Sequence, residues 1–434
     1  MIRTGLLQGS FFLAALVVTG LLASTVFFPA AATVAAPTST TAAYQLGDEI
    51  ELSPQMSPID PDRFHPSAAY NDKHGQYLVV WHNAYPSGHD REVVGQRMDA
   101  FGNKIGANFA ISTGAHDRVQ PAVVYNHTDD KYLVVYMYDV SGDGKKYDID
   151  GVFVSWDGTV GTPFTIQTYT DCSFWQPAVA YNADLNEYVV VWTVKDQTSQ
   201  LAIQIGAYEL DHNGGIVYGY LLMTSNTPTN PDITFDPVNH RYLVVWNYLL
   251  VGVNEVAYDL RDTGFTSLHR GNYFVSNTND GLFPKAAASL GMFYFVTYEY
   301  VNSSTDHDIV LVLAGADGQG LAASTLVSGT SNDTGAAIAA SKLKSEYMVA
   351  FQRADENGAK ALLRPGSSDM PTDLVDICDY LGANCTSPTV IAGGAGYLFV
   401  YLVDTPLSTP LTRQHVYARI LSTQNVFMPV ISKN

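Results

Sequence analysis

One apolar segment occurs four times in this sequence with only small changes. It reads QYLVVW at 76–81, KYLVVY at 131–136, EYVVVW at 187–192 and RYLVVW at 241–246. No copy shows the polar alternation of a strand with one face in water, so each predicts a β-strand with apolar neighbours on both faces. Any fold of this chain must therefore cover each copy on two sides.

Each copy is the second strand of a longer repeat. A shorter predicted strand precedes it, and these strands begin at Pro66, Pro121, Pro177, Pro231, Pro284, Ala336 and Pro388, at intervals of 52 to 56 residues. A third strand that ends in an Asp- and Gly-containing turn, and then a fourth strand, follow in most repeats. Four antiparallel strands per repeat of this length are typical of propeller blades, whose neighbours cover both faces of each sheet.

The two ends of the repeat region predict how the ring closes. The seventh repeat holds only three predicted strands, whereas LGDEIELS at 46–53 matches the fourth-strand pattern and belongs to no other repeat. Pairing this segment with the outer edge of the last blade removes an exposed sheet edge. The predicted fold is all-β: a seven-bladed β-propeller of four-stranded antiparallel blades, closed by an N-terminal strand. An open solenoid, which needs polar caps on its end repeats, is the competing architecture.

Glycines recur in the predicted third strands. Gly95, Gly151 and Gly206 follow the last aromatic residue of the apolar strand by 14 or 15 residues. Glycine weakens a strand unless something packs closely over it. We therefore expect an aromatic ring, with the residue that ends the apolar strand as the first candidate, to lie across each glycine.

The first residues predict export. Arg3 precedes a long apolar stretch, and small residues follow that stretch, as at a signal-peptidase site. We interpret residues 1–36 as a signal peptide or N-terminal anchor, 37–43 as a flexible linker, 44–423 as the propeller and 424–434 as a short tail. An uncleaved membrane anchor is the alternative, because a spanning helix needs about 20 apolar residues. Both interpretations place the folded part outside the cytoplasm, secreted or attached to the cell surface.

Charge and cysteine content narrow the class further. The net charge is −19 and no cluster of Lys and Arg exists, which argues against nucleic acid as a partner. We expect a monomer. In an exported chain, Cys378 and Cys385, separated by six residues, are expected to form a local disulfide and to leave Cys172 unpaired.

The repeat resembles those of exported bacterial β-propellers of unassigned activity. The shared pattern is Pro, Tyr-Asn, YLVVW, a D-I-x-G-like third strand, a D-x-x-G turn and an F-x-I-S strand. It covers most of residues 46–421, is specific in repeats one to three, partial in four and degraded in five to seven. The resemblance implies fold and export more than function.

The residues before the prolines are the candidate ligand contacts. His65, Gln120, Gln176 and Asn230 reach the ring axis if the first strand of each repeat lines it. They are then expected to form a hydrogen-bonding collar for a polar ligand such as a sugar. The alternative is that they bond backbone groups between blades, as many polar side chains do.

Aromatic residues lie in loops on the same predicted face. They are Tyr85, Tyr138, Tyr147, Trp175, Tyr248 and Tyr300. Flat rings beside amides are typical of carbohydrate and peptide surfaces, because they provide large contact area at little entropic cost. We select Tyr85, Tyr138 and Trp175 as ligand-binding candidates.

Carboxylates on this face leave an enzymatic alternative open. Those that precede the first strands at comparable offsets are Asp62, Asp117, Asp171, Asp280 and Asp333. A glycoside hydrolase needs two such groups, whereas Asp in loops most often caps turns. No G-x-S-x-G, H-E-x-x-H or phosphate-loop motif is present.

No cofactor is expected, although one loop offers oxygen ligands for calcium. Asp143, Asp148 and Asp150 cluster there without the spacing of an EF-hand, so a solvated loop is the simpler interpretation. The sequence therefore favours an exported, non-catalytic binding or scaffold propeller for glycan or protein ligands. A polysaccharide-degrading hydrolase or lyase is the alternative.

Overall fold

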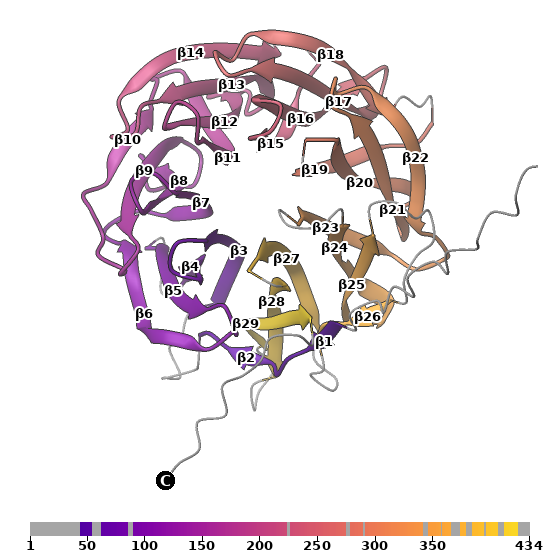
Figure 1. Ribbon diagram of the computed structural model, residues 1–434. Coiled ribbons are helices and arrows are strands. Elements are labelled where there is room, and N and C mark those ends of the chain that lie inside the picture. Colours follow the sequence, from indigo (N-terminus) through magenta and orange to yellow (C-terminus); the bar gives the residue numbers. More distant parts are fainter. Residues whose placement is uncertain are drawn as a thin grey trace, which may run out of the picture. The chain divides into compact units, whose positions relative to one another are not determined.

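The computed structural model contains seven antiparallel sheets arranged in a ring (Figure 1). It describes residues 44–53, 62–85, 90–223, 226–274, 278–289, 291–341, 346–356, 358–365, 374–378, 384–394, 396–406 and 412–423. The single helical element among them is a 3-10 turn at Ala354–Glu356. The predicted signal peptide or anchor, the linker and the tail lie outside the described residues.

Blades 1 to 6 take their strands in sequence order from the ring axis outward, whereas the outer edge of blade 7 comes from the N-terminal end of the described chain. Blades 1 to 3 contain β3 (Asp62–Asn71), β4 (Gln76–Ala84), β5 (Glu92–Asp99), β6 (Lys104–Ser112); β7 (Arg118–Asn126), β8 (Lys131–Asp139), β9 (Tyr147–Ser155), β10 (Phe164–Gln167); β11 (Cys172–Asn182), β12 (Glu187–Asp196), β13 (Ala202–Leu210) and β14 (Ile216–Met223). Blades 4 to 6 contain β15 (Thr229–Asp236), β16 (Arg241–Leu250), β17 (Val253–Asp262), β18 (Ser267–Phe274); β19 (Gly281–Ser289), β20 (Phe293–Ser303), β21 (Asp306–Gly315), β22 (Gly320–Val327); β23 (Asp333–Ala340), β24 (Glu346–Arg353), β25 (Gly358–Pro365) and β26 (Val375–Asp376). Blade 7 contains β27 (Cys385–Gly393), β28 (Gly396–Pro406), β29 (Thr412–Thr423), β1 (Tyr44–Leu46) and β2 (Ile50–Glu51).

The repeated apolar strand is the second strand of its blade and is buried on both faces. In β4, Leu78 and Val80 pack against blade 2, and Val79 and Trp81 pack against blade 7. All four side chains are at most 1% exposed. Burial of such a side chain contributes about 1.5 to 3 kcal/mol, so the repeated strands supply the cores between blades.

The N-terminal segment closes the ring. β1 and β2 both pair antiparallel with β29, with Leu46 opposite Leu421 and Ile50 opposite Ala418. The inner strands β27 and β3 then lie side by side, as Figure 1 shows for every neighbouring pair of blades. The predicted fold class, including seven blades and the N-terminal closing strand, is confirmed.

Aromatic rings cover all three third-strand glycines, but their source differs. A Cβ atom on Gly95 would lie 3.0 Å from Phe109, and one on Gly151 would lie 2.9 Å from Phe164, both from fourth strands. A Cβ atom on Gly206 would lie 2.8 Å from Nε1 of Trp192, the residue directly opposite it. The expected aromatic cover is present, whereas the expected donor strand is correct only in blade 3.

A disulfide joins Cys378 and Cys385, as expected, with Cα atoms 6.5 Å apart. Cys172 is free and half-buried, and burial raises the pKa of its thiol. Within the described part of the chain, no helix is long and apolar enough to cross a membrane.

Candidate functional site

Every inner strand contains a β-bulge at the residue before the predicted proline position. In β3 the pairing with β4 skips between Phe64 and Ser67, and equivalent skips occur in the other six inner strands. The bulged residues all have positive φ, between 49° and 63°: His65, Gln120, Gln176, Asn230, Phe283, Gly335 and Ser387. Positive φ is uncommon for non-glycine residues, so its sevenfold recurrence is a property of the blade. Such bulges redirect a side chain away from the regular ladder.

We call His65, Gln120, Gln176 and Asn230 the axial collar. Its second half is well satisfied: Gln176 Nε2 donates to Asn230 Oδ1, the Asn230 backbone N–H donates to Gln176 Oε1 (3.1 Å), and Thr193 donates to the same oxygen (3.0 Å). The two bonds between Gln176 and Asn230 join blades 3 and 4. Bonding between blades is the alternative role considered for these residues in the sequence analysis.

The first half of the collar has unfilled hydrogen-bonding capacity. Gln120 Nε2 and His65 Nε2 are 3.5 Å apart, at the outer limit of a hydrogen bond. Gln120 Oε1 is buried and accepts no hydrogen bond from the described residues. Leaving a buried acceptor unpaired costs about 1 to 3 kcal/mol, so this half differs energetically from the Gln176–Asn230 half.

His65 is exposed at the bulge of the inner strand of blade 1, and its pKa lies below the usual value for histidine. Water reaches its ring, yet the protein around it still lowers its pKa by desolvation, and the charges of Arg91 and Lys285 lower the pKa further. Lys285 belongs to β19 of blade 5, and its ammonium lies 3.7 Å from Asp232 of blade 4. His65 also stacks on the buried His82, with ring centroids 5.3 Å apart. Sequence analysis missed His82 and Lys285.

Trp175 is half-buried under polar neighbours. Its indole N–H donates to Ser173 Oγ (2.8 Å), and the Lys195 ammonium lies 3.7 Å from its ring centre. Desolvation lowers the pKa of Lys195. The ring is therefore covered by a cation in this structure, and a ligand that stacks on Trp175 must displace Lys195.

The predicted tyrosines are also held by neighbours. Tyr85 donates to Glu92 Oε1 (2.5 Å), and the Arg118 guanidinium lies 4.9 Å from the Tyr138 ring centre. Both tyrosines are half-buried, as is Tyr300, whereas Tyr147 and Tyr248 are buried and offer no ligand surface. Fewer aromatic rings are available on this face than the sequence suggested.

Most candidate catalytic carboxylates form structural hydrogen bonds. Asp117 accepts from the backbone N–H of Arg91 (3.1 Å), and Asp280 accepts from that of Asn254 (2.6 Å). In both cases the donor begins the third strand of the preceding blade, and Asp62 reaches Gln414 of blade 7 in the same way (3.3 Å). These carboxylates link blades. Asp333 instead accepts two bonds from Arg353, and Asp171 is exposed.

The loop proposed for calcium is organised by a different residue. The fully buried Asp139 accepts from the N–H groups of Gly142 (2.9 Å) and Gly144 (2.7 Å). Asp143 is exposed, while Asp148 and Asp150 lie in β9. Among the residues with described positions, no three His, Cys, Asp or Glu side chains form a group that could hold a metal ion.

Asp148 and Asp150 have perturbed acidities. Desolvation raises the pKa of Asp148, and it raises the pKa of Asp150 to about 6. One oxygen of each carboxylate is buried without a hydrogen-bond partner among the described residues. Residues two apart on a strand share one face, and their cross-strand neighbours are Tyr138 and Tyr136. Tyr136 packs toward blade 1, so both carboxylates lie between blades 1 and 2.

Comparison with known proteins shows the fold and no family. No protein-family model matches the chain, and no curated protein matches it in sequence. Similar solved structures include a protein of unknown function from Dyadobacter fermentans DSM 18053 (9% identity, TM-score 0.55), the polysaccharide lyase Uly1 (8%, 0.52) and a puromycin hydrolase (13%, 0.53). They cover 88%, 87% and 82% of this chain and 99%, 99% and 53% of their own. At these identities the likeness establishes a β-propeller and carries no activity.

Proposed function

We propose that this protein is an exported, non-catalytic binding propeller that takes a glycan at the axial collar. The observation that carries the proposal is the unfilled hydrogen-bonding capacity of Gln120 beside the exposed His65. Amide and neutral imidazole groups both donate and accept hydrogen bonds. That combination suits sugar hydroxyls, which also do both. Protein ligands remain the other outcome of the test.

Binding is favoured over catalysis because the nominated carboxylates are engaged. Asp62, Asp117 and Asp280 accept backbone hydrogen bonds between blades, and Asp333 is bound by Arg353. A carboxylate in such a bond is held away from acid–base work. The exported bacterial propellers that the repeat resembles also have no assigned activity.

A polysaccharide hydrolase or lyase is the second candidate, and one observation favours it. Asp148 and Asp150 form a carboxylate pair with Cα atoms about 7 Å apart by strand geometry, and the pKa of Asp150 is raised to about 6. A general acid needs a raised pKa of this kind. The pair lies between two blades instead of at the axis, which is why the binding function ranks first.

A matched pair of variants tests the collar. His65→Ala combined with Gln120→Ala removes its unfilled half, whereas Ser387→Ala changes the equivalent bulge in blade 7, which has no amide or imidazole. Binding to starch, xylan, alginate and hyaluronan is measured by affinity electrophoresis and calorimetry. We expect at least one polysaccharide to bind wild type and Ser387→Ala equally, and the double variant about tenfold or more weakly.

Two results would overturn the proposal. One is the absence of binding to every polysaccharide, and the other is equal binding by the double variant. Release of reducing ends or unsaturated products by wild type, lost in Asp150→Asn, would establish the enzymatic alternative. Export is tested separately by fractionating cells that express the full chain and a chain without residues 1–36. We expect only the full chain outside the cytoplasm, and its recovery in the membrane fraction would indicate an uncleaved anchor.

A further inference from the structure

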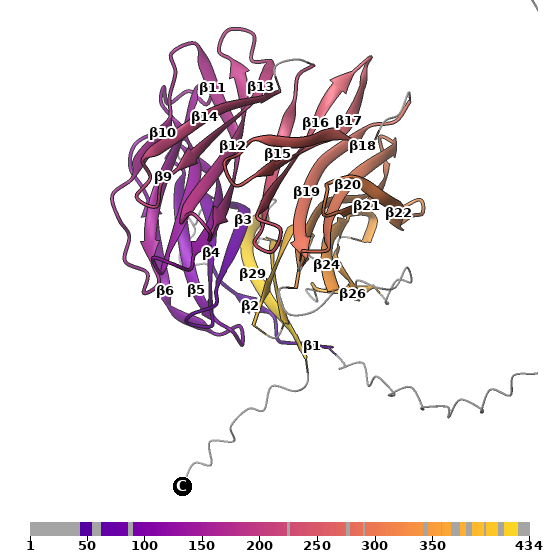
Figure 2. The ribbon, with the colours of Figure 1, turned by 45° about the horizontal axis from the view of Figure 1, so that its top comes forward.

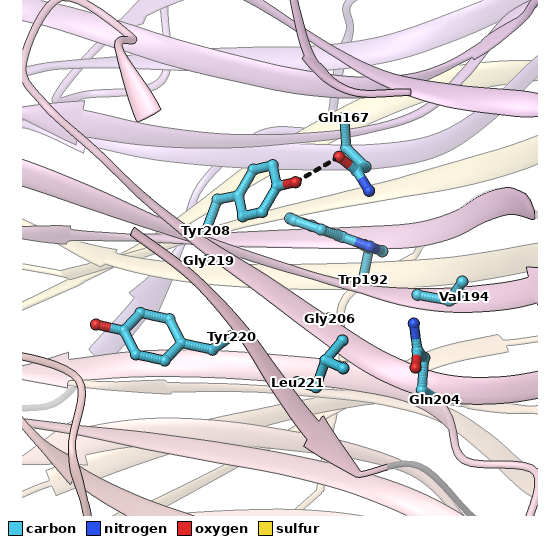
Figure 3. Close-up of a pocket in the computed structure, with 9 residues that line it drawn as sticks. All are labelled: Gln167, Trp192, Val194, Gln204, Gly206, Tyr208, Gly219, Tyr220 and Leu221. Atoms are coloured by element: carbon cyan, nitrogen blue, oxygen red, sulfur yellow. Dashed lines mark hydrogen bonds between the residues drawn. The ribbon is translucent and has the colours of Figure 1, made fainter. Parts of the chain in front are cut away.

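The outer wall of the ring carries a cavity between blades 2 and 3, about 290 Å³ in volume. Figure 3 shows its lining, which includes Trp192, Gln204, Tyr208 and Leu221 of blade 3 and Gln167 of blade 2. The volume is at the small end of the range for ligand pockets. The cavity has room for one ring-sized unit and is remote in the blade from the bulges at the axis.

Two local features create this cavity. Strand β10 of blade 2 contains four residues, whereas the outer strand β14 of blade 3 contains eight, so blade 2 leaves part of its neighbour uncovered (Figures 1 and 2). Gly206 and Gly219 also contribute no side chains to the floor. Tyr208 stands beside Gly219 and donates to Gln167 Oε1 (2.7 Å), which fixes one wall.

The indole nitrogen of Trp192 has no hydrogen-bond partner in the described structure. Trp192 is 2% exposed and lines the cavity, yet its Nε1 meets no acceptor. The other enclosed indoles are bonded: Trp81 donates to Asn83 Oδ1 (2.9 Å), Trp175 to Ser173 Oγ (2.8 Å), and Trp246 lies 3.3 Å from Met223 Sδ. A buried donor left unpaired costs about 1 to 3 kcal/mol, and an acceptor brought by a ligand recovers it.

The lining chemistry specifies the class of ligand. All nine residues around the cavity are uncharged. Gln167 retains its NH2 donors after accepting from Tyr208, and Gln204 adds a second amide beside Trp192. Aromatic rings, two amides and a free indole donor together suit a flat, neutral, polyhydroxylated ring. We infer that this cavity is a second binding site, separate from the axial collar, for a single neutral sugar unit.

The equivalent groove between blades 3 and 4 provides an internal control. Its lining includes Trp246 and Arg270, and the Arg270 guanidinium also bonds Asp259. The groove therefore contains a charge and an engaged indole. A neutral sugar that recognises the Trp192 donor is not expected to bind in the groove between blades 3 and 4.

The experiment follows the five indole N–H signals of the protein by 15N NMR during titration with glucose, galactose, mannose and xylose. The Trp192 signal is assigned by its absence in Trp192→Phe. We expect at least one sugar to move this signal saturably, with a dissociation constant on the order of 1 mM, while the Trp246 signal stays in place. Glucuronate, which is charged, is expected to leave the Trp192 signal unmoved.

Calorimetry of the variants completes the test. Trp192→Phe keeps a six-membered aromatic ring and removes the five-membered ring together with its N–H donor, so its folding is checked first by chemical denaturation. The folded variant is expected to bind the sugar about tenfold more weakly. Trp246→Phe and the double collar variant are expected to bind it like wild type. A Trp192 signal unmoved by all four neutral sugars, equal binding by Trp192→Phe, or loss of binding in the double collar variant would each overturn the inference.

Discussion

The acidity and the packing of single residues in this protein depend on the side chains next to them. Asp150 illustrates this. In blade 2 it lies opposite Tyr136, whereas in blade 3 the equivalent residue, opposite Trp192, is Gly206. The same place in the repeat thus holds a half-buried acid in one blade and a glycine that lines a cavity in the next. Blades 2 and 3 have the same strand arrangement, and the side chain at this one position makes their surroundings chemically different.

Gly151→Val is expected to lower the free energy of unfolding by about 1 to 3 kcal/mol, because overpacking forces neighbours to move. A Cβ atom there would lie 2.9 Å from Phe164 and 3.0 Å from Ile166. Gly320→Val is the control, since its Cβ would make ordinary contacts at 3.5 Å. Chemical denaturation measures both variants, and equal stability of the two would contradict the close packing over Gly151.

Asp150→Asn is expected to raise stability above pH 6. The native pKa of about 6 exceeds that of an unfolded Asp, so the folded state binds the proton more tightly. Stability is therefore lost as pH rises from about 4 to 6, and the ionised carboxylate destabilises the fold above that range by roughly 1 to 3 kcal/mol. Denaturation at pH 4 and pH 8 should show a gain for Asp150→Asn only at pH 8. A difference between the two proteins that does not change with pH would refute the assignment.

At the scale of the element, every inner strand contains a bulge that interrupts its regular pairing with the second strand of the blade. All seven bulged residues have positive φ, although only Gly335 is a glycine. Non-glycine residues in this conformation cost roughly 1 to 3 kcal/mol, so the repeat retains a locally unfavourable backbone in six blades. The bulge carries the collar residues in blades 1 to 4 and Phe283 and Ser387 in blades 5 and 7, so the strained backbone belongs to the blade plan whichever side chain it carries.

Substitutions of Ser387 test whether the bulge backbone is strained. Its side chain is exposed, so Ser387→Gly removes strain without removing contacts and is expected to leave stability unchanged or raise it by up to about 1 kcal/mol. Ser387→Val places a β-branched residue at φ of 49° and is expected to lower stability by roughly 1 to 3 kcal/mol. Thermal unfolding ranks the variants, and Val at or above wild-type stability would show that the bulge is not strained.

At the scale of the molecule, the ring is held by contacts that recur between blades. Buried clusters fill each interface, and at the ends of the blades opposite the bulges, histidines contact aspartates of neighbouring blades, as in His74–Asp130 (2.8 Å) and His240–Asp184 (2.7 Å). Exposed contacts of this kind contribute about 0 to 1 kcal/mol each. The apolar clusters and the closing segment therefore dominate the stability of the ring.

A substitution at Leu52 tests how much the N-terminal closing segment contributes to the stability of the ring. It is fully buried in the cluster between blades 7 and 1, so Leu52→Ala is expected to cost about 2 to 5 kcal/mol, as in any core. Leu185→Ala changes a leucine that is 49% exposed and should be nearly neutral. A Leu52→Ala protein as stable as Leu185→Ala would mean that the N-terminal segment does not hold the ring shut.

The sequence by itself determined the strands, the count of blades and the closing segment. Each of these depends on the repeated apolar segment and on a repeat length, which are properties of the chain read in order. Gly95 and Gly151 likewise signalled close packing without knowledge of the ring. Their partners were not predictable, because Phe109 and Phe164 come from the fourth strand of the same blade, whose register over the third is not visible in the sequence.

Only the tertiary structure decided which polar groups are satisfied. Besides desolvation, the charges of Arg91 from blade 1 and Lys285 from blade 5 lower the pKa of His65, so side chains of two blades act on one group. Gln176 and Gln120 occupy the same place in similar repeats, yet Gln176 Oε1 accepts from Asn230 of the next blade, whereas Gln120 Oε1 has no partner among the described residues. Hydrogen bonding depends on ångström-scale positions of neighbouring blades, which arise when the ring closes, whereas strand formation needs only the pattern within one repeat.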